Sequence, residues 1–167
     1  MSGEVGPAKR CAACGELSDK WNEPLYGLKI KRRKYDLSST YDGVTIASER
    51  FLSLYQESGF TGLRFRRLPD DPAFHDIYPI REVQVDQGRS LLRLKRWCPV
   101  CSRYGCALGP RVEFAPDTVV EDREFARSDL EFADGDEKYP LFLVGRDIPN
   151  VLKTSKMKGF SISKKTD

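Results

Sequence analysis

The sequence predicts an α+β fold in which two related strand-helix-strand lobes are joined by a zinc-ribbon-like pair of CxxC motifs. Two observations predict it: two CxxC motifs of the same spacing lie far apart, and segments 46–67 and 143–164 align without a gap. With 167 residues, the chain can bury a core without disulfides. We therefore expect a single domain over 1–167, with pseudo-repeat halves at about 11–67 and 98–165.

The two CxxC motifs have the spacing of a structural zinc site. Two residues between thiolates let a tight turn present both sulfurs to one ion, and tetrahedral zinc needs two such turns brought together. A small residue follows each pair, Gly15 in "CAACG" and Ser102 in "CPVCS", as zinc knuckles favour. The predicted Zn²⁺ ligands are Cys11, Cys14, Cys98 and Cys101.

Other roles for the cysteines stay open. A redox CxxC usually occurs as a single pair that opens a helix after a strand, which neither pair here does. The four thiols could also be two unrelated buried pairs. A catalytic zinc would need an open position and a nearby base, and the only histidine, His75, lies in a predicted loop. Cys106 is expected to be a small buried residue, although it could replace one ligand.

The first aligned segment, 46–67, has the signals of a strand, a helix and a second strand. Ser48 is a candidate helix cap, and Phe51, Leu54 and Tyr55 share one helical face. Gly59 then ends the helix. The alternating "GLRFRRL" closes the unit as a strand, and we expect the longest helix of the chain near 48–58.

The second aligned segment, 143–164, repeats this order. Asp147 can cap a helix, and Pro149 lies in its first turn, where a missing amide costs little. The alternating "GFSISK" is the expected closing strand. Chance similarity between two ordinary strand-helix-strand stretches is the alternative. The expected apolar face of the second helix consists of Ile148, Val151 and Leu152.

Charge is spread unevenly over a chain whose net charge is only +3. The run "KIKRRK" at 29–34 is nearly all basic and lies in a predicted half-exposed strand over 25–37. Segment 113–137 holds ten acidic and two basic residues, a net charge of −8. Between these runs, 80–98 predicts two strands joined at "DQG". Each charge run is typical of a solvated face. The functional alternatives are a phosphate contact for the basic run and a docking surface for the acidic run.

Several function classes lack their signatures. The chain contains no P-loop, GxGxxG, GxSxG or HExxH motif, so we expect no enzyme activity. No apolar run is long enough to cross a bilayer, and the polar N-terminus has no signal-peptide core. We therefore expect a cytoplasmic protein without a membrane partner, whose cysteines stay reduced.

The order "CAACG", "YDGVTIASERFLSLYQESGFTGLRFRRL", a second CxxC and "LVGRDIPNVLKTSKMKGFSI" resembles the double-CXXCG motif proteins of myxobacteria. The resemblance spans about Cys11 to Phe160, and departs from the family pattern at Ser102, where the family has glycine. That family is grouped with immunity proteins against Sit-type toxins exchanged between kin. The resemblance thus implies a non-catalytic antitoxin used in bacterial competition.

An immunity protein of this kind binds and neutralises one cognate protein toxin. Because a basic toxin would be drawn to an acidic surface, the acidic segment supplies the candidate contact face. The alternative is a zinc-ribbon module that binds nucleic acid through "KIKRRK" and "LRFRRL", although aromatic strand residues are more often core. The candidate toxin-contact residues are Glu121, Asp122, Glu124, Asp129 and Glu131.

Overall fold

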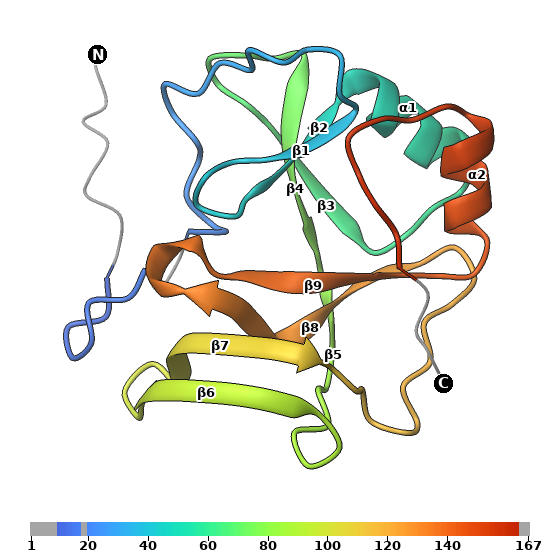
Figure 1. Cartoon of the computed structure of the whole chain (residues 1–167). Coiled ribbons are helices and arrows are strands. Elements are labelled where there is room, and N and C mark those ends of the chain that lie inside the picture. The colour runs from blue at the N-terminus through green and yellow to red at the C-terminus, as the bar shows by residue number, and fades with distance from the viewer. Residues whose placement is uncertain (1–9, 18–19, 164–167) are drawn as a thin grey trace.

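The structure is a computed structural model that describes residues 10–17 and 20–163. Over these residues the chain is mixed α+β, with two sheets, two α-helices and one 3-10 turn (Figure 1). The first sheet has the order β1-β2-β4-β3, and the second has the order β5-β8-β7-β6 with β9 added on β8. The elements are β1 (Leu37–Ser39), β2 (Thr45–Ser48), α1 (Glu49–Glu57), β3 (Leu63–Arg67), β4 (Phe74–Pro79), β5 (Arg81–Val83), β6 (Leu91–Cys98), β7 (Arg103–Arg111), β8 (Phe125–Asp134), η1 (Gly135–Glu137), β9 (Tyr139–Val144) and α2 (Ile148–Thr154).

The first strand-helix-strand unit forms as predicted from β2, α1 and β3. The Ser48 hydroxyl accepts a hydrogen bond from the Phe51 amide at 3.2 Å, which caps α1 where the sequence indicated. The helix ends before Gly59, whose φ of +63° suits glycine. Phe51 is fully buried, and Leu54 and Tyr55 pack against the same core, so the expected apolar face of the helix is confirmed.

The second unit forms only in part, from β9 and α2. Pro149 lies in the first turn of α2 as expected, but the Asp147 side chain makes no capping hydrogen bond. The predicted closing strand is wrong over 159–163, which carries no strand, and Lys164 lies outside the described residues. Gly159 has a φ of +98°, and the chain there crosses the start of β1. The Lys158 carbonyl accepts the Asp36 and Leu37 amides at this crossing, and no further strand pairing follows over 159–163.

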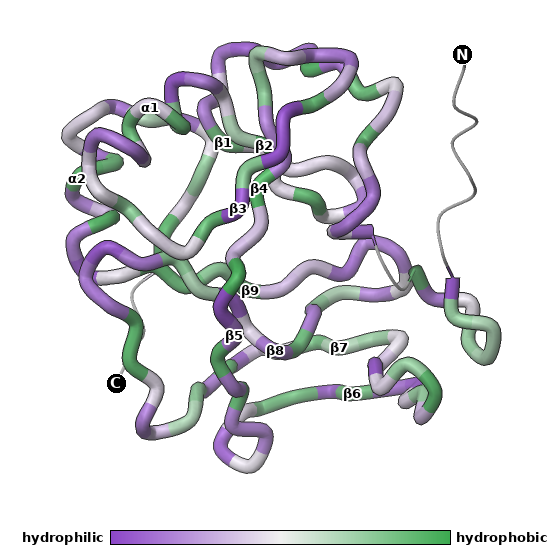
Figure 2. The backbone as a smooth tube through the Cα atoms, turned by 180° about the vertical axis from the view of Figure 1, so that it is seen from behind, coloured by the Kyte–Doolittle hydropathy of each residue, from purple (hydrophilic) through white to green (hydrophobic). Residues whose placement is uncertain are grey.

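Both helices pack on one apolar core. Phe51 of α1 and Ile148 and Leu152 of α2 are buried in the same cluster as Phe125 of β8. Figures 1 and 2 show α1 and α2 side by side on one flank of the molecule. The helix of the second unit therefore completes the core of the first.

A tight backbone crossing joins the two sheets. Gly62 has a φ of +89°, and a Cβ there would lie 2.2 Å from the carbonyl oxygen of Phe125. Thr61 and Glu124 form a parallel bridge beside it. Only glycine lets β3 and β8 begin this close together.

Two predictions about the connecting segments need correction. The predicted half-exposed strand over 25–37 is wrong, since only Leu37 belongs to a strand. The carboxylate of Asp71 explains this, because it accepts hydrogen bonds from the Ile30 amide and the Arg33 guanidinium. The two strands predicted over 80–98 exist as β5 and β6, but β5 pairs in parallel with β8 and not with β6.

Candidate metal centre

The first CxxC lies in a short turn that closes on itself. Arg10 and Leu17 form an antiparallel bridge around it, and the Cys11 amide donates to the Glu16 carbonyl at 2.8 Å. The Gly15 amide donates back to the Cys11 carbonyl at 2.8 Å. Gly15 has a φ of +76°, a conformation that glycine adopts without strain. The sequence "CAACG" thus folds as a knuckle.

The second CxxC forms the turn of the β6–β7 hairpin. Cys98 is the last residue of β6 and pairs with Arg103, the first residue of β7. Ser102, which follows the second cysteine as Gly15 does in the first pair, has a φ of +53°. The small residues noted in the sequence therefore occupy equivalent left-handed positions in the two turns.

The four predicted ligands meet at one point. The Sγ atoms of Cys11 and Cys98 lie 3.9 Å apart, and those of Cys14 and Cys101 lie 3.7 Å apart. All four sulfurs lie within 4.8 Å of one another. Tetrahedral zinc with Zn–S bonds of ~2.3 Å sets its sulfurs about 3.8 Å apart. The observed separations fit one tetrahedral ion and exceed the ~2.05 Å of a disulfide.

The backbone of each turn favours the thiolate form of its first cysteine. The amides of Cys14 and Ala13 point at the Cys11 sulfur and lower the pKa of that thiol to about 7. The Cys101 amide lowers the pKa of Cys98 in the same way. Burial and the neighbouring sulfurs raise the pKa of Cys101 to about 12. Because several thiolates this close repel one another, full ionisation requires a cation among them.

Ion pairs hold the first knuckle against the second sheet. Glu16 pairs with Lys138 at 2.8 Å, and both side chains are nearly buried, at 13% and 4% exposed. Arg10 makes two hydrogen bonds to the Asp136 carboxylate, at 3.1 and 2.7 Å. These contacts place the knuckle beside the β6–β7 turn (Figures 1 and 2). Glu16 and Lys138 were missed from the sequence, because no local pattern connects residues 122 positions apart.

The donor set is closed and made of sulfur. Within 10–17 and 20–163, the cysteine cluster contains no histidine or carboxylate. Cys106 is buried on β7 outside the cluster, which agrees with its expected role as a small core residue. His75 lies on β4, not in the predicted loop, and is 4% exposed. Four sulfurs around one point suit a tetrahedral metal ion such as Zn²⁺.

Three of the predicted toxin-contact residues lie in and beside the loop before β8. Asp122 pairs with Arg146 at 2.8 Å on the surface. Glu124 pairs with Arg81 at 2.5 Å, and its carboxylate also accepts the Glu121 amide. The Glu121 residue itself is exposed. The structure therefore brings these three together, with two of the carboxylates engaged inside the chain.

The other two predicted contact residues, Asp129 and Glu131, follow on β8 itself. The Asp129 carboxylate accepts the Val85 amide at 2.9 Å. The Glu131 carboxylate accepts the indole N–H of Trp21 at 2.8 Å. Both carboxylates thus hold neighbouring segments in place.

Two of the three arginines of "LRFRRL", Arg64 and Arg66, are engaged inside the protein, while Arg67 is exposed. Arg66 pairs with the buried Asp76 at 2.8 Å and donates to the Glu23 carbonyl at 2.6 Å. Arg64 donates to the side-chain oxygen of Asn22 at 3.1 Å. The strand therefore anchors the segment around 21–23 and offers few free donors to an external phosphate.

Comparison with known protein families, curated proteins and solved structures finds no match to this chain. Among the residues that the structure describes, no helix has the length and apolarity needed to cross a membrane.

Proposed function

We propose that this protein is a non-catalytic binding protein whose two CxxC turns are joined by one structural Zn²⁺. The observation that carries the proposal is the meeting of four sulfurs from two distant turns, at separations that suit a tetrahedral ion. The bound ion would neutralise the thiolates and cross-link the turns. The paired turns would then form a zinc ribbon between the N-terminal segment and the β6–β7 hairpin.

A closed sulfur site supports a binding role over catalysis. Structural zinc sites have four protein ligands, whereas catalytic sites keep a position for water or substrate. The ion pairs Glu16–Lys138 and Arg10–Asp136 prepare the site before metal binds. A rigid protein loses little conformational entropy when it associates with a partner.

The partner that we propose is a cognate bacterial toxin, which the protein neutralises as an immunity protein. The order of the two CxxC motifs and the two strand-helix-strand segments supports this, through the resemblance to the double-CXXCG family. The acidic residues 121–131 stay a candidate contact face, of which Glu121 and the exposed Asp122–Arg146 pair are the parts open to a partner.

Co-expression tests this function. The gene is expressed in a bacterial host together with each open reading frame beside it in its genome, and survival is compared with and without the protein. We expect one neighbouring frame to be toxic alone and harmless with the protein. Cys98→Ser should lose protection through loss of metal, while Cys106→Ala should keep it. If no neighbouring frame is both toxic and neutralised, the immunity function is wrong.

A further inference from the structure

A groove of about 830 Å³ lies beside β1, an outer strand of the first sheet, and neither the metal centre nor the candidate contact face uses it. It runs between segment 28–41 and the stretch 159–161 that follows α2. Its volume falls in the ~300–1,000 Å³ range of ligand sites. The basic run "KIKRRK" supplies one wall.

The groove exists because two distant segments cross. The Lys158 carbonyl accepts hydrogen bonds from the amides of Asp36 at 2.9 Å and Leu37 at 3.0 Å. A Cβ on Gly159 would lie 1.9 Å from the Leu37 carbonyl oxygen, so the crossing is as close as a backbone allows. This contact sets residues 159–161 across the groove from the basic residues at 29–32.

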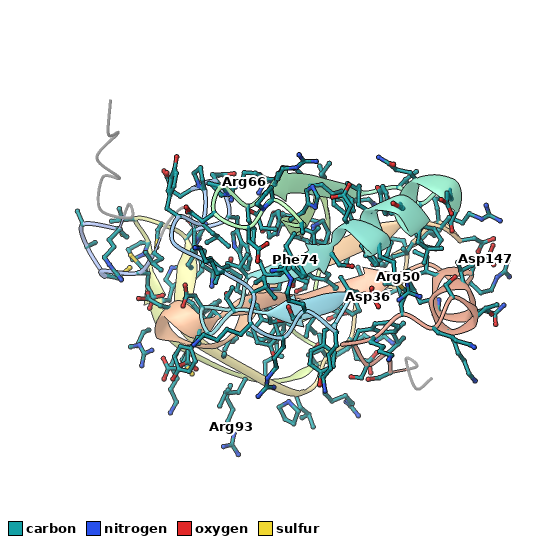
Figure 3. The ribbon with its side chains drawn as sticks, turned by 90° about the horizontal axis from the view of Figure 1, so that it is seen from above. Asp36, Arg50, Arg66, Phe74, Arg93 and Asp147 are labelled. Atoms are coloured by element: carbon teal, nitrogen blue, oxygen red, sulfur yellow. The ribbon has the colours of Figure 1, made fainter. Side chains whose placement is uncertain are left out.

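In the part of the chain that the structure describes, cations outnumber carboxylates at the groove: Asp71 lies near enough to interact with Lys29, and the Glu137 carboxylate accepts a hydrogen bond from the Tyr41 hydroxyl. The residues that line it include Lys29, Lys31 and Arg32 and no acidic residue. Among the described residues, no ion pair joins Lys31 or Arg32 to a carboxylate. The nearest carboxylate in sequence, Asp36, is 6% exposed and pairs with Arg50 at 2.9 Å. Figure 3 shows the Asp36 and Arg50 side chains close together.

Aromatic rings accompany these cations. Tyr35, Tyr41 and Phe160 line the groove, and Tyr41 is 85% exposed. The Lys34 ammonium lies over the Tyr35 ring, 5.2 Å from its centroid. Single-stranded nucleic acids bind cationic grooves with exposed rings, because their phosphates pair with the cations and their unpaired bases stack on the rings.

We propose that this groove binds single-stranded nucleic acid. Phosphodiester charge complements Lys29, Lys31 and Arg32, and a base stacks on Tyr41. An acidic peptide fits less well, because its carboxylates cannot stack and because the Leu37 amide, at the open edge of β1, already donates to Lys158. This activity goes beyond toxin binding, and the groove shares no residue with the metal centre.

Fluorescence anisotropy with labelled twelve-nucleotide oligouridylate and oligothymidylate tests the proposal on the zinc-loaded full chain. At low salt we expect binding of at least one strand, weakening as salt rises. The double variant Lys31→Glu/Arg32→Glu should weaken binding at least tenfold and reduce the salt slope, since each lost phosphate contact contributes about 0.7 to the slope for single strands. Tyr41→Ala should weaken binding ~10-fold without changing that slope.

A matched control carries the same charge change elsewhere. Arg93 and Lys95 are exposed on β6, and Figure 3 shows Arg93 pointing away from the protein. Arg93→Glu/Lys95→Glu should alter affinity less than threefold, and all variants should melt within a few degrees of the wild type. The proposal is overturned if neither oligonucleotide binds, or if the two double variants lose equal affinity. It is also overturned if polyglutamate displaces the labelled oligonucleotide as readily as the unlabelled strand does. An unchanged affinity in Tyr41→Ala would equally overturn it.

Discussion

Removal of the metal should lower the stability of the fold by an amount that follows from the chain length between the ligands. Each sulfur contact joins residues 87 positions apart, Cys11 to Cys98 and Cys14 to Cys101. In the folded protein this loop is already closed by ion pairs and sheet contacts. The unfolded chain must close it to hold the same ion, and closing a loop of that length costs about 4 kcal/mol.

The unfolded chain therefore binds zinc more weakly than the folded protein does. When zinc saturates both states, this difference in zinc affinity adds to the free energy of unfolding. Chelation should therefore lower the free energy of unfolding by about 4 kcal/mol, a large share of the ~5–15 kcal/mol typical of a folded protein. The midpoint of thermal unfolding should fall by about 8–16 °C in a chain of this size.

Urea unfolding before and after treatment with a zinc chelator measures the change, with tryptophan fluorescence as the signal. Readdition of zinc should restore the original midpoint. Cys106→Ala is the matched control, because its buried thiol lies outside the cluster, and it should respond to the chelator as the wild type does. A change below about 1 kcal/mol would refute the reasoning, since it would show that the ion does not join the two distant turns.

Three further predictions concern residues other than the cysteines. Lys138→Ala leaves the Glu16 carboxylate without its buried partner and should cost about 3–5 kcal/mol in urea unfolding, whereas a cost below 1 kcal/mol would mean that water screens the pair. Gly62→Ala drives a Cβ into the Phe125 carbonyl and should cost at least ~2 kcal/mol; an unchanged urea midpoint would contradict the close crossing of the two sheets. Burial lowers the pKa of His75, so the unfolded chain takes up the proton first, and stability should fall as the pH drops below about 6.5. His75→Gln should lose less stability than the wild type between about pH 7.5 and pH 5.5, and equal losses would rule out this source of acid sensitivity.

Local signals in the sequence predicted the first unit and the cysteine turns well. The cap at Ser48, the glycine at 59 and the apolar face of α1 are all set by residues within one or two helical turns. The CxxC spacing likewise specifies a tight turn by itself. The meeting of the two turns was predicted from the chemistry of a four-sulfur site, and the sulfur distances agree with it.

Features that depend on distant contacts were not predictable in this way. The alternation over 25–37 is typical of a strand. The Asp71 carboxylate, however, accepts hydrogen bonds from the Ile30 amide and the Arg33 side chain, so the Ile30 amide is not available for strand pairing. The stretch after α2 has a strand-like pattern too, yet its Lys158 carbonyl bonds to β1. That crossing builds the cationic groove, which the basic run alone did not reveal.

The metal content and coordination of the purified protein test the central claim most directly. Elemental analysis should find one zinc per chain, and X-ray absorption at the zinc edge should show four sulfur neighbours at ~2.3 Å. The variant Cys98→Ser should lose the ion, while Cys106→Ala should retain it. A folded wild-type protein without zinc, or a zinc ion bound mainly by nitrogen and oxygen, would contradict the account.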